Sequence, residues 1–372
     1  MRGRRLRPDR VGARAHRRGS RAPTREGGVR FADVVGHVRA IERLRRAAAA
    51  DRLAAAYLLT GPPGIGKRLV ADAFAARILC AAPEGDDACQ ACAHCTRVVA
   101  GTHPDLRTVE RDEERRDIRI EQVRELSRWL ALQPLMAQRK VAIIEGAHCL
   151  SEPAQNALLK TLEEPPPSAV LLLTAAAAAL LLPTVRSRCQ AVRMDPLPPE
   201  AVARVLVAQG VAPDRAALLA AEAEGSPGRA VALSGDEEAR ARTAVLKALP
   251  ALGTLDAAAL SALAQELSRG PVDAALGTTA AWYRDVLETA LTGDPPRRNP
   301  DAAAAVRAAA DRSPPARALR QLDVVCDTID ALGRNANRVL ALETMLLALR
   351  ALERDGAVGD RPTDRRAPHG SA

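Results

Sequence analysis

The 372-residue chain has few aromatic residues and few lysines. Phe, Trp and Tyr together make up 2% of it, and its 54 basic residues are nearly all arginine. Ala, Leu and Val carry most of the apolar content, which is 47% of the residues against 27% charged. This balance is typical of a globular protein. A chain of this length is too long to fold around a single hydrophobic core, so we expect two or three domains.

The sequence also lacks a long apolar run and a visible secretory signal. No stretch is apolar for long enough, without helix-breaking residues, to cross a bilayer as a helix. The N-terminal residues do not show the short apolar core that a signal peptide needs. We therefore expect a cytoplasmic protein that has no membrane partner.

The basic charge is confined to one end of the chain. The net charge is +9, and the first 30 residues alone hold eleven arginines and two acids, which accounts for the whole excess. The basic isoelectric point therefore does not indicate a basic face on the folded body. We expect a disordered basic leader over residues 1–29 and a disordered tail over 356–372. A transit peptide and a nucleic-acid-binding arm are alternatives to an extension without function, which we favour.

A glycine-rich segment separates a short apolar strand from a helix. Ala56–Thr60 is the expected strand and Leu69–Arg77 the expected helix, the context in which a phosphate-binding loop occurs. Backbone N–H groups of such a loop and the helix N-terminus attract phosphate, and its lysine reaches the outer phosphates. The candidate nucleotide-binding residues of the loop are Gly61, Pro62, Pro63, Gly64, Ile65, Gly66, Lys67 and Arg68.

Two positions of this nucleotide motif lack the groups that hydrolysis needs. The motif has Ser or Thr after the lysine to bind magnesium, but this chain has Arg68. The apolar strand that starts at Lys140 ends in Glu145, a candidate metal-side carboxylate, and Gly146 follows where an acid would activate water. An ordinary strand-end charge explains Glu145 equally well. We expect a loop that suits ATP or ADP and is poorly equipped for hydrolysis.

Four of the seven cysteines fall within sixteen positions, at Cys80, Cys89, Cys92 and Cys95. Four thiolates on short turns suit tetrahedral zinc, and an odd total with one tight cluster favours a metal over disulfides. We expect a structural zinc site, because protein ligands would fill all four positions. An iron–sulfur cluster and incidental thiols are the alternatives. His94 could replace one thiolate as a ligand, but we expect it to be a solvated neighbour of the site.

Strands alternate with helices from residue 31 to about residue 195, which predicts a parallel sheet wrapped by helices. Beyond Pro196 the strand pattern fades and short helices follow. We expect three domains in the folded part: an α/β domain over 30–195 with an insert at 80–95, a three-helix domain over 196–236, and a helical domain over 237–355.

Two stretches carry a family resemblance that no packing rule would generate. They are Asn156–Pro166, with its Leu-Glu-Glu-Pro-Pro, and Leu182–Cys189, with its Ser-Arg-Cys. Together with Phe31–Gly36, the glycine-rich loop and the four cysteines, they resemble the AAA+ clamp-loader subunits of bacterial DNA polymerase III over about residues 31–352. The resemblance implies an α/β P-loop AAA+ module with a zinc insert, a three-helix lid and an all-α collar that oligomerises.

The resemblance also implies roles for three residues. Arg188 of the Ser-Arg-Cys motif would be an arginine finger that enters the ATP site of a neighbouring subunit in trans. Thr174 matches the first sensor position and Arg229 the second, and we expect both to be structural relics here. Without the resemblance, Arg188 would be interpreted as an ordinary surface arginine.

Within that family the chain looks like the non-hydrolysing stator, because Arg68 and Gly146 replace motor residues. The implied partners are the gamma/tau and delta subunits, the sliding clamp, and primer–template DNA reached through the assembled hetero-oligomeric ring. The chain would then have no ATPase of its own and would belong to a DNA polymerase, hence nucleotidyltransferase, holoenzyme. The alternatives are an ATP-hydrolysing gamma/tau-type motor and a nucleic-acid-binding module that acts through the leader.

Overall fold

The computed structural model describes residues 30–111, 117–334 and 336–354, so the predicted leader and tail lie outside the described residues. The contacts divide the chain into two units. The first unit comprises the described residues within Met1–Asp33, Glu42–Leu59 and Arg68–Ala191. The second comprises those within Val34–Ile41, Thr60–Lys67 and Val192–Ala372.

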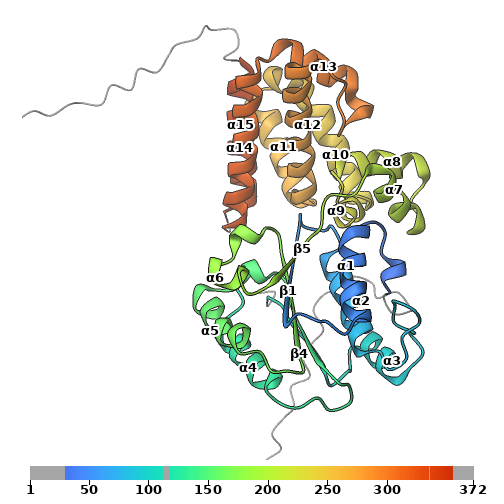
Figure 1. The fold of residues 1–372 in the computed structure, drawn as a ribbon. Coiled ribbons are helices and arrows are strands. Elements are labelled where there is room, and N and C mark those ends of the chain that lie inside the picture. Colours follow the sequence, from blue (N-terminus) through green and yellow to red (C-terminus); the bar gives the residue numbers. More distant parts are fainter. Residues whose placement is uncertain (1–29, 112–116, 335, 355–372) are drawn as a thin grey trace, which may run out of the picture. The chain divides into compact units, whose positions relative to one another are not determined.

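The strands form one five-stranded sheet in the order β2-β3-β4-β1-β5 (Figure 1). Their bounds are Ala56–Thr60 (β1), Leu106–Val109 (β2), Lys140–Ile144 (β3), Ala169–Ala175 (β4) and Gln190–Arg193 (β5). β3 pairs in parallel with both β2 and β4. Every residue of β3 and β4 is buried, which explains why both are apolar runs, apart from Lys140 and Thr174, rather than alternating ones. The predicted parallel sheet is confirmed.

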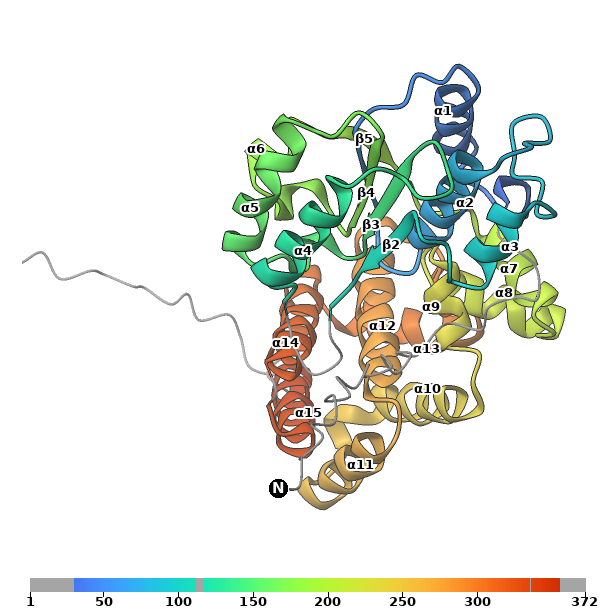
Figure 2. The ribbon, with the colours of Figure 1, turned by 90° about the horizontal axis from the view of Figure 1, so that it is seen from below.

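Helices cover both faces of this sheet (Figures 1 and 2). Their bounds in the first part of the chain are Val38–Ala49 (α1), Lys67–Leu79 (α2), Ala93–Val99 (α3), Ile120–Leu130 (α4), Glu152–Glu163 (α5) and Pro183–Arg186 (α6). On one face, Leu126 of α4 and Leu158 of α5 share an apolar cluster with Leu171 of β4. On the other, the Phe74 ring of α2 meets the Tyr57 ring of β1 edge-on, with centroids 5.1 Å apart.

Three elements of this part escaped the sequence analysis. β2 and β5 have only four residues each, and α3 has seven, too few to show a clear periodicity. For residues 118–120 the sequence predicts a short strand or an extended piece. Ile118 forms an isolated bridge to Leu150 and Arg119 is extended, but Ile120 already begins α4.

The chain beyond β5 is helical among the described residues. The helices are Pro199–Ala208 (α7), Pro213–Glu222 (α8), Pro227–Ala232 (α9), Asp236–Ala248 (α10), Ala257–Arg269 (α11), Val272–Thr292 (α12), Ala303–Arg312 (α13), Pro315–Gly333 (α14) and Arg338–Arg354 (α15). Short 3-10 helices lie at Phe31–Asp33, Ala147–Cys149, Ala178–Leu180, Leu249–Thr254 and Pro300–Ala302. One apolar cluster gathers α7, α8 and α9, and a separate one gathers α10 to α15. We call residues 196–236 the lid and 237–355 the collar; that boundary stays a prediction.

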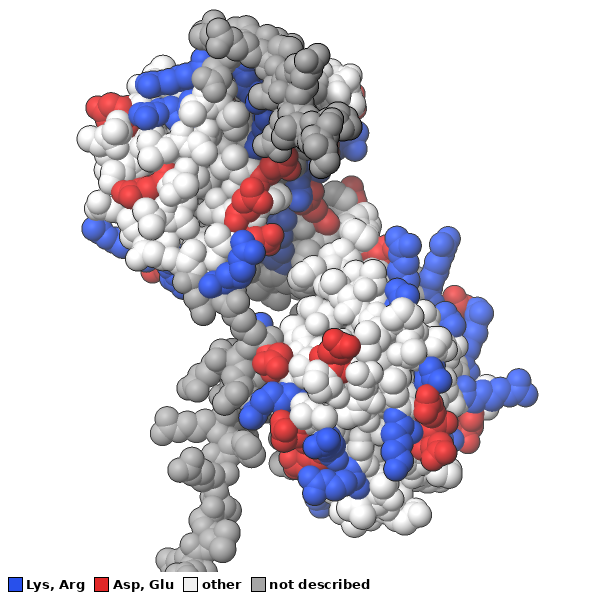
Figure 3. Space-filling view, turned by 90° about the vertical axis from the view of Figure 1, so that its left-hand side faces the viewer, with Lys and Arg blue, Asp and Glu red and all other residues white. Residues whose placement is uncertain are grey.

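None of the described helices combines the length and the apolar character that a membrane crossing requires. Basic and acidic side chains both occur on each unit in the face that Figure 3 shows. This mixture agrees with the neutral formal charge of the chain beyond its first 30 residues.

Candidate functional site

The glycine-rich loop of residues 61–67 turns sharply between β1 and α2. Gly64 and Gly66 have φ angles of +73° and +103°, a backbone region that glycine adopts without strain. The Lys67 ammonium donates hydrogen bonds to the carbonyl oxygens of Gly61 and Pro62, each at 2.7 Å. The lysine therefore folds back onto its own loop.

Arg68, at the position where the motif has a hydroxyl, is surrounded by carboxylates. Its Nε lies 2.8 Å from Oδ1 of Asp72, one turn further along α2. Its Nη1 donates to Oε2 of Glu145 at the end of β3, and its Nη2 reaches the Thr108 hydroxyl of β2 at 3.4 Å. The structure thus pairs Arg68, the residue that replaces the motif hydroxyl, with Glu145, the candidate metal-side carboxylate.

Electrostatics hold this guanidinium in its charged form. Burial works against the charge, but the carboxylates of Asp72 and Glu145 outweigh burial and raise the pKa of Arg68 above its ordinary value. The carboxylate oxygens that a divalent cation would need are therefore engaged with a permanent positive charge.

The residue that follows Glu145 has no side chain that could act as a base. Gly146 follows Glu145 with a φ of +67°, and its N–H donates to the Thr174 hydroxyl of β4 at 3.0 Å. Thr174, the predicted first-sensor position, is buried. It therefore holds the turn after β3, while its descent from a sensor position stays a prediction.

Arg188 lies just after α6 and is exposed. Its Nη2 is 2.8 Å from Oε1 of Glu163, and its Nη1 donates to the Thr184 carbonyl at 3.0 Å. These two contacts hold the guanidinium on the surface of the first unit. Its role in trans stays a prediction.

Arg229, the predicted second-sensor residue, lies in the first turn of α9 in the second unit. Its Nη1 is 3.3 Å from Oε2 of Glu224, and its Nη2 donates to the Gly277 carbonyl of α12 at 3.4 Å. Both partners belong to the chain itself.

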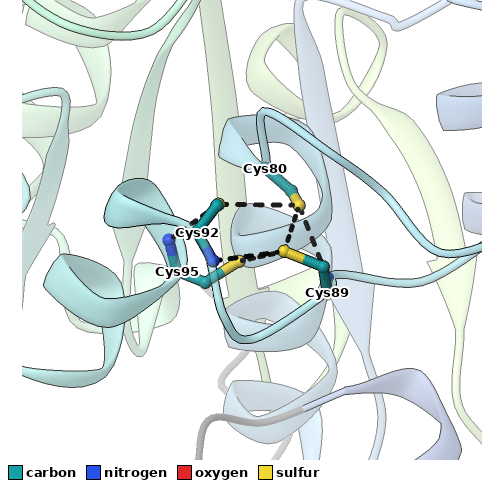
Figure 4. A group of neighbouring side chains, drawn as sticks. All are labelled: Cys80, Cys89, Cys92 and Cys95. Carbon is teal, nitrogen blue, oxygen red and sulfur yellow. Dashed lines mark hydrogen bonds between the residues drawn. The ribbon is translucent and has the colours of Figure 1, made fainter.

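The four clustered cysteines come together at the end of α2 and the start of α3 (Figure 4). All four sulfurs lie within 4.8 Å of one another. The Sγ–Sγ distances are 3.5 Å for Cys80–Cys89 and 4.0 Å for both Cys80–Cys92 and Cys89–Cys95. A zinc ion with bonds of about 2.3 Å to four sulfurs places them about 3.8 Å apart, so the donor set fits that metal.

Backbone N–H groups also point at these sulfurs. The amides of Cys89, Cys92 and Cys95 donate to the sulfurs of Cys80, Cys89 and Cys92 respectively. Burial opposes a thiolate at Cys92, but the N–H groups of Cys95 and Ala81 outweigh it and lower the pKa of Cys92 to about 6. Burial raises the pKa of Cys95. The cluster therefore favours at least one thiolate before any metal binds.

His103 and Asp105, which the sequence analysis did not single out, connect the insert to its surroundings. His94 is half-buried, with its Nδ1 3.0 Å from Nε2 of His103, so the expectation of a solvated His94 is wrong. The buried Asp105 carboxylate accepts N–H bonds from Leu135, Met136 and Ala137. The sequence offers only a weak signal for these residues: a histidine and an acid flank Pro104, but the strand that follows, β2, was itself not predicted.

Asp87 performs a similar task at the other end of the insert. Its carboxylate accepts the N–H groups of Phe31 and Ala32 at 3.1 and 3.0 Å, and it pairs with Arg45 of α1. The cysteine insert therefore fixes the first residues of the described chain.

Comparison with known proteins agrees with this architecture. A family model described as DNA polymerase III, delta subunit, matches residues 36–198, and one described as DNA polymerase III, delta subunit, C terminal, matches residues 236–351. The DNA polymerase III subunit delta' of Pseudomonas aeruginosa is 34% identical over 308 residues, which cover 81% of this chain and 93% of that relative.

Two Bacillus subtilis proteins match shorter stretches. Its DNA polymerase III subunit delta' is 35% identical over 198 residues, which cover 53% of this chain and 59% of the relative. Its subunit tau is 32% identical over 161 residues, which cover 43% of this chain and 28% of the relative.

The parallel sheet, the phosphate loop and the helical C-terminal part define an AAA+ P-loop protein of the clamp-loader class. The match to the Pseudomonas relative runs through nearly its whole length. The chain belongs to the family of delta' subunits of the DNA polymerase III clamp loader.

Proposed function

We propose that this chain is the non-hydrolysing stator of a clamp loader. The observation that carries the proposal is the ion pair between Arg68 and Glu145. Magnesium in a P-loop ATPase is held by the hydroxyl after the lysine and by an acid at the end of a strand. In this chain Arg68 stands in place of the hydroxyl residue, and its guanidinium binds the strand-end acid, Glu145.

Gly146 supports the same proposal. Phosphoryl transfer needs a positioned water or hydroxyl and neutralised charge on the γ-phosphate. Glycine offers no side chain to orient water, and the Glu145 carboxylate that would help to hold the metal is already paired with Arg68. An ATP or ADP molecule bound by residues 61–67 would therefore remain unhydrolysed.

The exposed Arg188 supports a role in trans. A guanidinium on the surface, held by Glu163 and Thr184, can approach a neighbouring subunit's triphosphate without unfolding its own element. An arginine supplied in trans is worth roughly 10³–10⁵ in the rate of phosphoryl transfer. The chain would then contribute to ATP hydrolysis in a motor subunit while performing none itself.

The collar offers a surface for assembly. Leu319 and Ile329 of α14 are exposed, and so are Leu340 and Leu347, seven residues apart on α15. Apolar side chains at that spacing lie on one face of a helix. We propose that the collar uses them to join gamma/tau and delta subunits in the cytoplasm, in a ring that helps load the sliding clamp onto primer–template DNA.

The four cysteines would hold a structural zinc ion. Their sulfur spacing fits tetrahedral coordination, and protein ligands fill every position. An iron–sulfur cluster fits less well, because its irons and bridging sulfides would hold the ligand sulfurs farther apart. The metal would stabilise the insert that carries Asp87 and His94.

The test is ATP hydrolysis by the purified chain and by a clamp loader reconstituted with it. We expect no magnesium-dependent turnover from the chain alone. Arg188→Ala should lower the ATPase of the assembled loader without preventing assembly. Arg186→Ala, at the last residue of α6 and two positions before Arg188, is the matched control and should leave it unchanged. Turnover by the isolated chain, abolished by Lys67→Ala, would identify a motor subunit instead.

A further inference from the structure

Lid helix α9 is attached to two other parts of the second unit. At its N-terminal end, the Ser226 hydroxyl donates to the Pro63 carbonyl at 2.9 Å, and the Gly228 N–H donates to the Gly64 carbonyl at 2.8 Å. On its first turn, Arg229 reaches Glu224 and the carbonyl of Gly277 in collar helix α12. The helix therefore connects the phosphate loop to the collar.

Glu224 is the centre of the connection to the collar. Besides Arg229, its carboxylate receives Nη1 of Arg284 in α12 at 2.6 Å. It also receives Nε of Arg298, in the segment after α12, at 2.7 Å. Burial disfavours this carboxylate, but Arg298, Arg284 and Arg229 outweigh burial and lower the pKa of Glu224. One lid acid thus gathers two collar arginines and the sensor-position arginine.

A second, deeper ion pair runs beside the first. Glu222 is fully buried at the end of α8, where Nε of Arg242 in α10 lies 2.6 Å from its Oε2. Thr278 of α12 donates its hydroxyl to the other oxygen of Glu222 at 2.7 Å. Arg242 also pairs with Asp301 at 2.7 Å. Removing one partner of such a buried pair leaves an uncompensated charge, so the lid and collar resist separation here.

We propose that Arg229 is a positioning residue that joins the lid to the collar through Glu224, so that the lid keeps one orientation to the collar whether or not a nucleotide is bound. A sensor arginine that follows nucleotide must be able to exchange its partners for phosphate. In this chain the exchange would leave Glu224 with fewer partners and break the contact with Gly277. The inference deepens the proposed function, because a subunit that does not hydrolyse ATP needs no nucleotide-driven lid movement.

The experiment measures the distance between one spin label on the lid and one on the collar of the full chain. Cys326 on α14 is exposed and serves as the collar site, and Gln209→Cys at the end of α7 supplies the lid site. Cys149→Ala and Cys189→Ala remove the half-buried thiols outside the metal cluster. The probe ligands are ATP and ADP, each with and without magnesium.

We expect one narrow distance distribution that none of these nucleotides shifts. Arg229→Ala and Glu224→Gln should broaden it, and Arg229→Lys, which keeps a charge for Glu224, should restore part of the narrow component. Arg240→Ala, on the exposed side of α10, is the control and should leave it narrow. A fold readout by circular dichroism accompanies each variant, because mere destabilisation would lower the melting temperature without this pattern of rescue.

Two results would overturn the inference. One is a shift of the wild-type distance when ATP is added, a measurement that needs no substitution at Arg229. The other is a distribution in Arg229→Ala as narrow as that of the parent chain. Both results are read from distances and not from ATPase measurements. ATP hydrolysis by the chain would refute the proposed stator role, but it would not decide whether the lid is fixed to the collar.

Discussion

The guanidinium of Arg188 lies 2.8 Å from the carboxylate of Glu163, and both side chains are partly solvated, at 35% and 49% exposure. An exposed ion pair of this kind contributes only about 0.2–1 kcal/mol to stability. The ion pair instead orients the Arg188 side chain, because it keeps the guanidinium beside the end of α5 rather than free in solvent. Glu163 is therefore a positioning residue for the proposed finger.

We expect Glu163→Gln to lower the ATPase of the assembled loader less than Arg188→Ala does. Losing up to about 1 kcal/mol of positioning corresponds to a decrease of at most about five-fold. Steady-state hydrolysis by loaders that carry each variant measures the difference. Glu164→Gln, the adjacent exposed acid, is the control. A loss as large as that of Arg188→Ala would show that Glu163 does more than orient the arginine.

Arg68→Thr restores the hydroxyl of the nucleotide motif and releases Glu145 and Asp72. We expect this variant to bind ATP more tightly in magnesium than in EDTA, because two carboxylates become available to a cation. The wild-type chain should show no such preference. Hydrolysis should remain absent in the variant, since Gly146 still offers no base.

Isothermal titration of each protein with ATP, with and without magnesium, tests the expectation. Arg68→Lys is the matched control, because it keeps the positive charge without supplying a hydroxyl. Equal magnesium dependence in the wild type and Arg68→Thr would contradict the idea that Arg68 takes the place of the cation.

The sequence predicted those elements that depend only on residues close together along the chain. The strand Ala56–Thr60 has the predicted bounds, because a buried parallel strand needs a continuous apolar run ended by glycine. The four cysteines are close in sequence, so their meeting in space needed no knowledge of the fold. Motif spacing also marked Arg68 as unusual.

Contacts between distant residues could not be predicted in this way. Arg68 and Glu145 are 77 positions apart, and only the pairing of β2 with β3 beside α2 brings them together. Asp105 lies 30 positions from Leu135, and its three N–H partners belong to a loop without any periodic pattern. The lid acid Glu224 finds Arg298 across 74 positions. In each case the sequence shows that a charged residue is present, but it does not show which distant residue that charge contacts.

Asp105→Asn should destabilise the loop that follows α4. Burial raises the pKa of this carboxyl, but the N–H groups of Ala137, Leu135 and Met136 outweigh burial and lower it below 3.8. Hydrogen bonds to a charged group are each worth about 1.5–3 kcal/mol, and asparagine keeps one acceptor oxygen, so we expect a loss of about 2–3 kcal/mol near neutral pH.

The pH dependence of this effect has a definite sign. Because the folded pKa is depressed, the stabilisation is complete above the ordinary value of 3.8 and is lost as the pH falls through the lower folded value. The difference in melting temperature between the wild type and Asp105→Asn should therefore shrink in that acid range. Glu110→Gln, at an exposed site, should show no difference at any pH.

Metal analysis of the purified chain should find about one zinc per molecule. Cys92→Ser should remove it and lower the melting temperature, whereas Cys326→Ser on the exposed face of α14 should do neither. Because Asp87 holds the backbone of Phe31 and Ala32, metal loss should also speed amide exchange there. A chain without metal and with unchanged exchange would refute the zinc assignment.

Gly228→Ala tests how closely the lid helix sits on the phosphate loop. A Cβ at Gly228 would come within 2.8 Å of both the Cα and the carbonyl oxygen of Gly64, which are backbone atoms with little room to move. Such overpacking costs about 1–3 kcal/mol, a decrease of a few degrees in melting temperature for a chain of this size. Gly270→Ala is the control, because its added Cβ meets nothing closer than 3.9 Å. If the two variants have the same melting temperature, the backbone around Gly64 and Gly228 moves apart at little cost, and α9 cannot be the rigid connection inferred above.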